Sequence, residues 1–230
     1  MMTRKHLALG LVLAALGGCA TEPTPAEVEA KLQEAIGWYT GEAGYVLDQR
    51  ARQLLTETVN LNYPLPQMWI ARCYSRGRMT YEQDSTKARL MAEEVIDRVR
   101  QIAEEGSVEA IFLMGSAYDE GLGVPVDSVV AIEWFLKAGD QGHTLAQHNL
   151  GNAYFAGRGV PQNDSLAAAW WRKAAEKGDA IAQYRLGSMY EEGRGVPQND
   201  SLAVVWYLNA AGRGDRRAQQ ALEAWEERGS

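Results

Sequence analysis

The sequence has few of the residues that most often carry chemistry. Its 230 residues include two cysteines, three histidines and three phenylalanines. His143 and His148 lie five positions apart, about 500° around a helix, so they do not share a helix face. No group of cysteines or carboxylates has the spacing of a metal-ligand set. We therefore predict no catalytic site, no metal site and no cofactor.

An excess of basic residues is also missing. The chain has 23 Lys and Arg against 30 Asp and Glu, a formal net charge of −7. A nucleic-acid partner requires a basic face, so none is expected. The apolar run Leu7–Leu16 is too short to span a bilayer as a helix.

The start of the chain has instead the layout of a secretory signal peptide. Arg4 and Lys5 precede the apolar run, and small residues follow it. Residues 1–18 are therefore predicted to be a signal peptide.

The residues at the end of this segment, Leu16-Gly17-Gly18-Cys19, resemble the lipobox of bacterial lipoproteins. The resemblance implies cleavage before Cys19 and lipidation of its thiol, and plain cleavage is the alternative. Ala20 after the cysteine implies sorting to the outer membrane. Residues 19–25 would then be a lipidated tether on the periplasmic face.

The chain carries an internal repeat with a period of 36 residues. The stretch GRGVPQNDSLA occurs at residues 157–167 and again at 193–203. Three blocks align without gaps, at residues 107–142, 143–178 and 179–214, and the last two share 20 of 36 positions. Such a period is typical of a solenoid, in which each unit must pack on its neighbours.

Each block predicts a pair of helices. The residues expected to cap the first and second helices are Ser107, His143, Asp179, Asp127, Asn163 and Asn199. We interpret His143 as a cap rather than a metal ligand. The first helix has an apolar face of alanine, leucine or methionine, and tyrosine at i, i+4 and i+8. A glycine inside this helix, at Gly115, Gly151 and Gly187, predicts close approach of another helix.

The two helices are joined by Gly-x-Gly-Val-Pro, and the second sets aromatic residues against alanines. Over residues 107–214 this pattern resembles the Sel1-like repeat, a relative of the tetratricopeptide repeat. The resemblance implies an all-α, right-handed α/α superhelical solenoid of helix hairpins.

The segments on either side complete the predicted organisation. Residues 65–106 are interpreted as a degenerate repeat with an extended second helix. Residues 26–64 are interpreted as capping helices, with a worn repeat as the alternative, and residues 215–230 as a C-terminal capping helix. Cys73 is predicted to be a small core residue.

The predicted binding surface is a stripe on the first helices, opposite their apolar face. By analogy with tetratricopeptide solenoids this stripe would line a concave groove. Unlike the core positions, its residues differ between the blocks, as expected for partner recognition. They are Glu109, Phe112, Asp119, Leu145, His148, Asn152, Phe155, Ile181, Tyr184, Ser188 and Glu191. The alternative is that Phe112, Leu145 and Ile181 pack between repeats. The acidic ends of the stripe suit a basic partner.

The predicted function is a non-enzymatic, lipid-anchored protein–protein interaction module in the periplasm. Sel1-like lipoproteins can occur beside secreted antibacterial effectors, so the resemblance implies an immunity protein that neutralises such an effector. A scaffold or assembly factor for an outer-membrane complex is the alternative. An enzyme is a third class, which the missing catalytic residues disfavour. Arg158 and Arg194 have no predicted role.

Overall fold

The computed structural model describes residues 23–40, 47–59 and 63–229, and these residues contain helices but no strand. The helices are α1 (Pro25–Thr40), α2 (Asp48–Val59), α3 (Pro64–Arg76), α4 (Ser85–Glu104), α5 (Val108–Glu120), α6 (Ser128–Asp140), α7 (Thr144–Ala156), α8 (Asp164–Glu176), α9 (Ala180–Glu192), α10 (Asp200–Gly212) and α11 (Arg216–Gly229). The predicted all-α class is confirmed.

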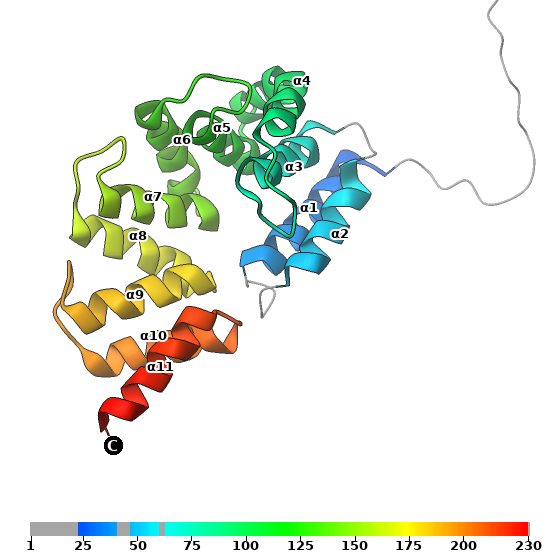
Figure 1. Ribbon diagram of the computed structural model, residues 1–230. Helices are drawn as coiled ribbons and strands as arrows, with labels where there is room; N and C mark the ends of the chain where they lie inside the picture. The colour runs from blue at the N-terminus through cyan, green and yellow to red at the C-terminus, as the bar shows by residue number, and fades with distance from the viewer. Residues whose placement is uncertain (1–22, 41–46, 60–62, 230) are drawn as a thin grey trace, which may run out of the picture.

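The helices pair in sequence order and the pairs stack on one another. The hairpins are α3–α4, α5–α6, α7–α8 and α9–α10, with α1–α2 before them and α11 packed on α10. They follow a curved path from α3 and α4 to α11 (Figure 1). This is the superhelical repeat fold expected from the sequence.

Side-chain caps fix where the repeat helices begin. Ser107, His143 and Asp179 accept hydrogen bonds from backbone N–H groups three residues later, at 3.4, 3.2 and 2.7 Å. Asp127, Asn163 and Asn199 do the same for the second helices, at 3.1, 3.0 and 2.9 Å. Each such cap stabilises its helix by about 1 kcal/mol. All six predicted caps are confirmed, including His143.

The connectors also repeat. Gly157, just after α7, has φ +67°, a left-handed conformation that glycine adopts without steric cost. Its N–H closes the helix on the carbonyl of Ala153. Further along the connector, the N–H of Asn163 returns to the carbonyl of Tyr154 at 2.8 Å. The connector therefore ends one helix and positions the cap of the next.

A glycine in the first helix allows an aromatic ring of the second to approach its backbone. A Cβ built on Gly115 would lie 2.6 Å from Cδ1 of Phe135, and one on Gly187 would lie 2.7 Å from Cδ1 of Tyr207. Gly151 meets the ring of Trp171 in the same way. The predicted close helix–helix approach is confirmed.

The segment before the complete repeats also forms helices. The hairpin α3–α4 includes a second helix of 20 residues, where the later repeats have 13. Cys73 in α3 is fully buried with a free thiol, and burial raises its pKa to about 12. Its prediction as a core residue is confirmed.

The N-terminal predictions fall mostly outside the described residues. The signal peptide of residues 1–18 and Cys19 lie there, as does most of the tether of residues 19–25. The tether's last residues start α1: Thr24 and Glu27 exchange hydrogen bonds as a capping box. In the part of the chain that the structure describes, no helix is both long enough and apolar enough to cross a membrane.

Replacing Gly115 with alanine is expected to lower the free energy of unfolding by about 1–3 kcal/mol, because the new methyl group would overlap the buried ring of Phe135. Gly212→Ala in α10 is the matched control. Nothing lies within 4 Å of its built Cβ, so it should gain up to about 1 kcal/mol of helix propensity. Urea unfolding followed by circular dichroism measures both. Equal stability of the two variants would contradict the close approach.

Candidate functional site

The predicted stripe runs over α5, α7 and α9, and its first part is covered. On α5, Phe112 is fully buried and Glu109 is 3% exposed. The ring of Trp69 in α3 lies 5.7 Å from that of Phe112, and its Nε1 donates to Glu109 at 2.6 Å. Gln33 of α1 also donates to Glu109, at 3.0 Å. The expectation that Phe112 and Glu109 lie on an open surface is wrong, because α1 and α3 lie over this part of α5.

Leu145, at the start of α7, is also buried. It lines a cavity of about 410 Å³ together with Gln33 and Ile36 of α1. Leu145 therefore faces the same cavity as residues of α1, whereas Phe112 packs against Trp69 of α3. The structure supports the alternative for Phe112 and Leu145, which is that they pack within the array.

The second part of the stripe is accessible, and we call it the open stripe. It consists of His148, Asn152, Phe155, Ile181, Tyr184, Ser188 and Glu191. These side chains come from α7 and α9, the first helices of two successive repeats. Ile181 is exposed, unlike Phe112 and Leu145, and the others are half-buried. The ring of Phe155 packs 5.3 Å from that of Trp171, and that of Tyr184 lies 5.7 Å from that of Tyr207.

Both histidines link one repeat to the next. His143 caps α7 with Nδ1, and its Nε2 lies 3.1 Å from Oε2 of Glu109. His148 Nδ1 lies 3.3 Å from Oδ1 of Asp179, the cap of α9. Burial raises the pKa of Glu109, but His143, Trp69 and Gln33 outweigh it, so the pKa lies below the usual value. His143 is thus both a helix cap and a contact between repeats, and His148 is a contact between repeats.

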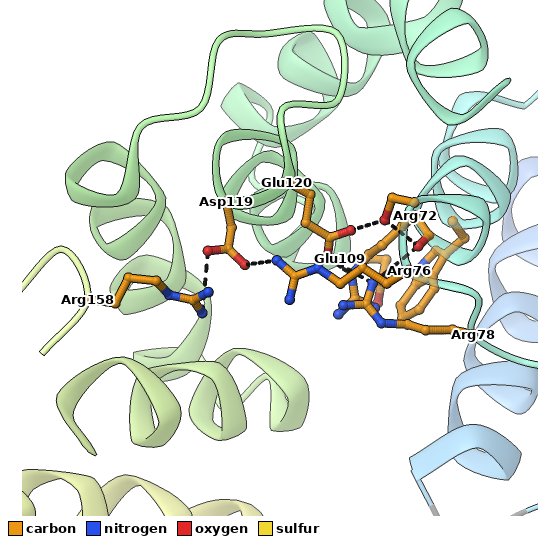
Figure 2. Close-up of polar contacts among 9 residues, drawn as sticks. Arg72, Arg76, Arg78, Glu109, Asp119, Glu120 and Arg158 are labelled. Atoms are coloured by element: carbon orange, nitrogen blue, oxygen red, sulfur yellow. Dashed lines mark hydrogen bonds and ion pairs between the residues drawn. The ribbon is translucent and has the colours of Figure 1, made fainter. Parts of the chain in front are cut away.

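A ladder of charges joins α3, α5 and the connector after α7 (Figure 2). The buried carboxylate of Glu120 pairs with Arg78 at 2.8 Å, Arg72 at 3.5 Å and Arg76 at 3.8 Å. The neighbouring Asp119 pairs with Arg76 at 3.2 Å and Arg158 at 3.4 Å. Asp119, a member of the predicted stripe, is therefore engaged inside the protein.

The ladder changes the acidity of its central carboxyl. Burial raises the pKa of Glu120, but Arg72, Arg78 and Arg76 together with the Ser75 hydroxyl outweigh it and hold the pKa below the usual range. Glu120 therefore stays ionised in the folded protein at neutral pH.

The structure gives Arg158 and Arg194 a role. Arg194 binds Asp164 with Nε and Nη2, at 2.7 and 3.2 Å. The residue one period before Asp164 is Ser128, which has no charge, and Arg158 reaches Asp119 instead. Both arginines tie a connector to the preceding repeat.

Arg78 occupies the same place in the degenerate repeat, directly after the glycine that ends α3, and pairs forward with Glu120. Sequence reasoning missed Arg72, Arg76, Arg78 and Glu120. The Gly-Arg dipeptide shared by the ends of α3, α7 and α9 was the available signal for Arg78.

Within residues 23–40, 47–59 and 63–229, no three histidine, cysteine or acidic side chains are grouped as a metal ion would require. The arrangement provides an open stripe bordered by ordered charges, which suits contact with another macromolecule.

Comparison with family models identifies the Sel1 repeat at residues 67–94, 108–143, 144–179 and 180–215, more than half of the chain. The chain belongs to the Sel1 repeat family. Sel1 repeats are protein-interaction modules. The match at residues 67–94 lies within residues 65–106, the segment that the sequence indicated as a degenerate repeat.

Solved structures share the fold. A Sel1 repeat protein from Oxalobacter formigenes is 33% identical with a TM-score of 0.57, covering 86% of this chain and 55% of that one. A protective antigen of uropathogenic Escherichia coli with an SLR fold is 30% identical with a TM-score of 0.53, covering 84% of this chain and 40% of that one. This chain thus spans about half the length of these relatives or less.

An immunity protein from Pseudomonas aeruginosa is more distant, at 22% identity and a TM-score of 0.49, covering 88% of this chain and 74% of that one. A likeness at this level carries no functional inference. No curated protein matches the chain.

Replacing Glu120 with glutamine is expected to lower the free energy of unfolding at pH 7 by about 3–5 kcal/mol, because it leaves buried arginines without their counter-charge. Glu93→Gln, at an exposed ion pair on α4, should cost less than about 0.5 kcal/mol. Urea unfolding measures both.

The pH dependence provides a second check. The pKa of Glu120 is lowered on folding, so its stabilisation is complete above the unfolded-state value of about 4.3 and is lost as the pH falls through the folded-state value. The difference in unfolding free energy between wild type and Glu120→Gln should therefore shrink as the pH falls from about 4.3 through the folded-state pKa. A difference that stays constant down to pH 2 would contradict this account.

Proposed function

We propose that the protein binds another protein through the open stripe and is not an enzyme. The observation that carries this proposal is the contrast between two faces of the same helices. One face repeats its alanine, leucine and glycine from block to block, while the open stripe changes, as in His148 against Tyr184 one period later. Packing requires the first face to stay constant. The half-buried and exposed side chains of the open stripe are under no such requirement, so they can differ to fit a partner.

The particular partner we propose is a secreted antibacterial effector, which makes this chain an immunity protein on the periplasmic face of the outer membrane. The support is the resemblance to Sel1-like lipoproteins together with the lipobox-like residues before Cys19. A scaffold in an envelope complex is the other outcome that the binding experiment below distinguishes.

The double variant Phe155→Ala/Tyr184→Ala is expected to weaken partner capture at least about tenfold, because aromatic anchors often dominate interfaces. Ile181→Glu, which places a charge on an exposed position, should do the same without touching the core. Leu208→Ala, exposed on α10, is the matched control. Affinity capture from envelope extract with quantitative mass spectrometry measures the effect.

The identity of the captured protein tests the narrower proposal. One secreted toxin as the dominant prey supports the immunity role, and several structural envelope proteins support the scaffold. If folded Ile181→Glu and the double variant capture the same partner as wild type, the open stripe is not the binding surface.

Cys19→Ala is expected to move the protein from the membrane fraction to the soluble fraction, because the thiol that would carry the lipid is gone. Cys73→Ala is the matched control and should remain with the membranes, since Cys73 is a buried core residue. Fractionation followed by immunoblotting measures the distribution. Cys19→Ala protein that still sediments with membranes would show that the anchor lies elsewhere.

A further inference from the structure

The acidic members of the predicted stripe are all engaged within the protein. Glu109 is buried against Trp69 and Gln33. Asp119 lies between two arginines, and Glu191 accepts a hydrogen bond from the hydroxyl of Tyr207 at 2.7 Å. The acidic ends that suggested a basic partner are therefore occupied.

Two of the three arginine ion pairs beside the open stripe have the cation outward and the acid inward, while in the third Arg194 is 35% and Asp164 27% exposed. Arg158 is 45% exposed and its partner Asp119 is 9% exposed. Arg217, in the first turn of α11, is 43% exposed and its partner Asp215 is 5% exposed. Water and any partner therefore meet the guanidinium groups, while the carboxylates are held behind them.

Ion pairs elsewhere lack this polarity. On α4, Arg89 is 59% exposed and Glu93 is 47% exposed, and the pair Arg50–Glu34 is similarly balanced. The outward cations are thus a property of the first-helix side of the array, where the open stripe lies, and not of the whole surface.

Arg194 and Arg217 cover aromatic side chains of the open stripe. The guanidinium carbon of Arg194 lies 4.1 Å from the ring centroid of Phe155, and that of Arg217 lies 4.7 Å from the ring centroid of Tyr184. Each holds its aspartate with Nε and Nη2, which leaves the Nη1 side for another acceptor. The stacking and the ion pair hold each guanidinium in place before a partner arrives.

The helices beneath contribute little negative charge. The whole of α7 contains no aspartate or glutamate. On α9 the acidic residues are Glu191, already hydrogen-bonded, and Glu192, while Asp179 and Asp215 are buried caps. Glu192 is exposed and Asp164 is 27% exposed, so Arg158 and Arg217 are the cations whose own carboxylates are held behind them.

We propose that the open stripe recognises an acidic protein segment, whose aspartate or glutamate side chains bind Arg158, Arg194 and Arg217. Carboxylates match the planar donor edge of a guanidinium, which gives both charge complementarity and direction. The inference rests on the proposed function, because it names the chemistry of the partner at the same surface.

Binding of short labelled peptides to the full chain tests the proposal. Fluorescence anisotropy compares oligoglutamate, oligoglutamine and oligolysine of equal length. Oligoglutamate should bind most tightly, and its binding should weaken with added salt. Arg158→Glu/Arg217→Glu should weaken it at least about tenfold. Arg89→Glu is the matched control, with the same charge change per site on α4.

The variant Arg158→Gln/Arg217→Gln removes the two charges without placing new acids beside Asp119 and Asp215, so it is less disruptive to folding. Its affinity for oligoglutamate should lie between those of wild type and Arg158→Glu/Arg217→Glu. Oligolysine binding more tightly than oligoglutamate, or oligoglutamate binding unaffected by both arginine double variants, would overturn the proposal. If partner capture depends on Phe155 and Tyr184 but not on these arginines, the acidic-segment inference fails while the proposed binding function stands.

Discussion

The packing of an aromatic ring against the bare backbone of a glycine sets the geometry of each complete repeat. Phe135, Trp171 and Tyr207 each occupy the space that a Cβ on the facing glycine would need. The two helices of a hairpin can therefore approach closely, and the alanines of the second helix are buried with the ring. This contact buries the glycine face of the first helix against the second helix. The opposite side is left to differ between repeats, and it is accessible on α7 and α9 where α1 and α3 do not cover it.

Local rules made most of the fold predictable from the sequence. Caps, connector glycines and mid-helix glycines depend on residues a few positions away, and three aligned blocks show each rule three times. The repeat boundaries and His143 as a cap follow from such rules. The covering of Glu109 and Phe112 does not follow from such rules. Trp69 lies 40 residues before Glu109, in a hairpin that matches the repeat pattern only weakly. Helical periodicity places Phe112 on a face but does not reveal which helix lies over that face.

The arginines after the first helices show the same limit at the level of charge. Arg158 and Arg194 have identical neighbours in sequence, GRGVPQNDSLA, yet pair with different partners. Arg194 finds Asp164, 30 residues earlier, whereas the equivalent position for Arg158 is Ser128. Identical connectors thus take different roles because the preceding repeat differs. Contacts within one repeat can therefore be predicted from its own sequence, whereas contacts between repeats depend on the residues of the neighbouring repeat.

Net charge is a poor guide to what such a surface binds. The chain carries −7 overall, which would suggest a basic partner if the charge were spread evenly. In two ion pairs beside the open stripe the buried member is a carboxylate and the exposed member is an arginine, so at these two points a partner meets a cation. At physiological salt the field of distant charges is screened beyond about 8 Å, whereas groups in contact interact directly. An acidic segment would therefore be repelled weakly at long range and held at contact, which favours selectivity over fast association.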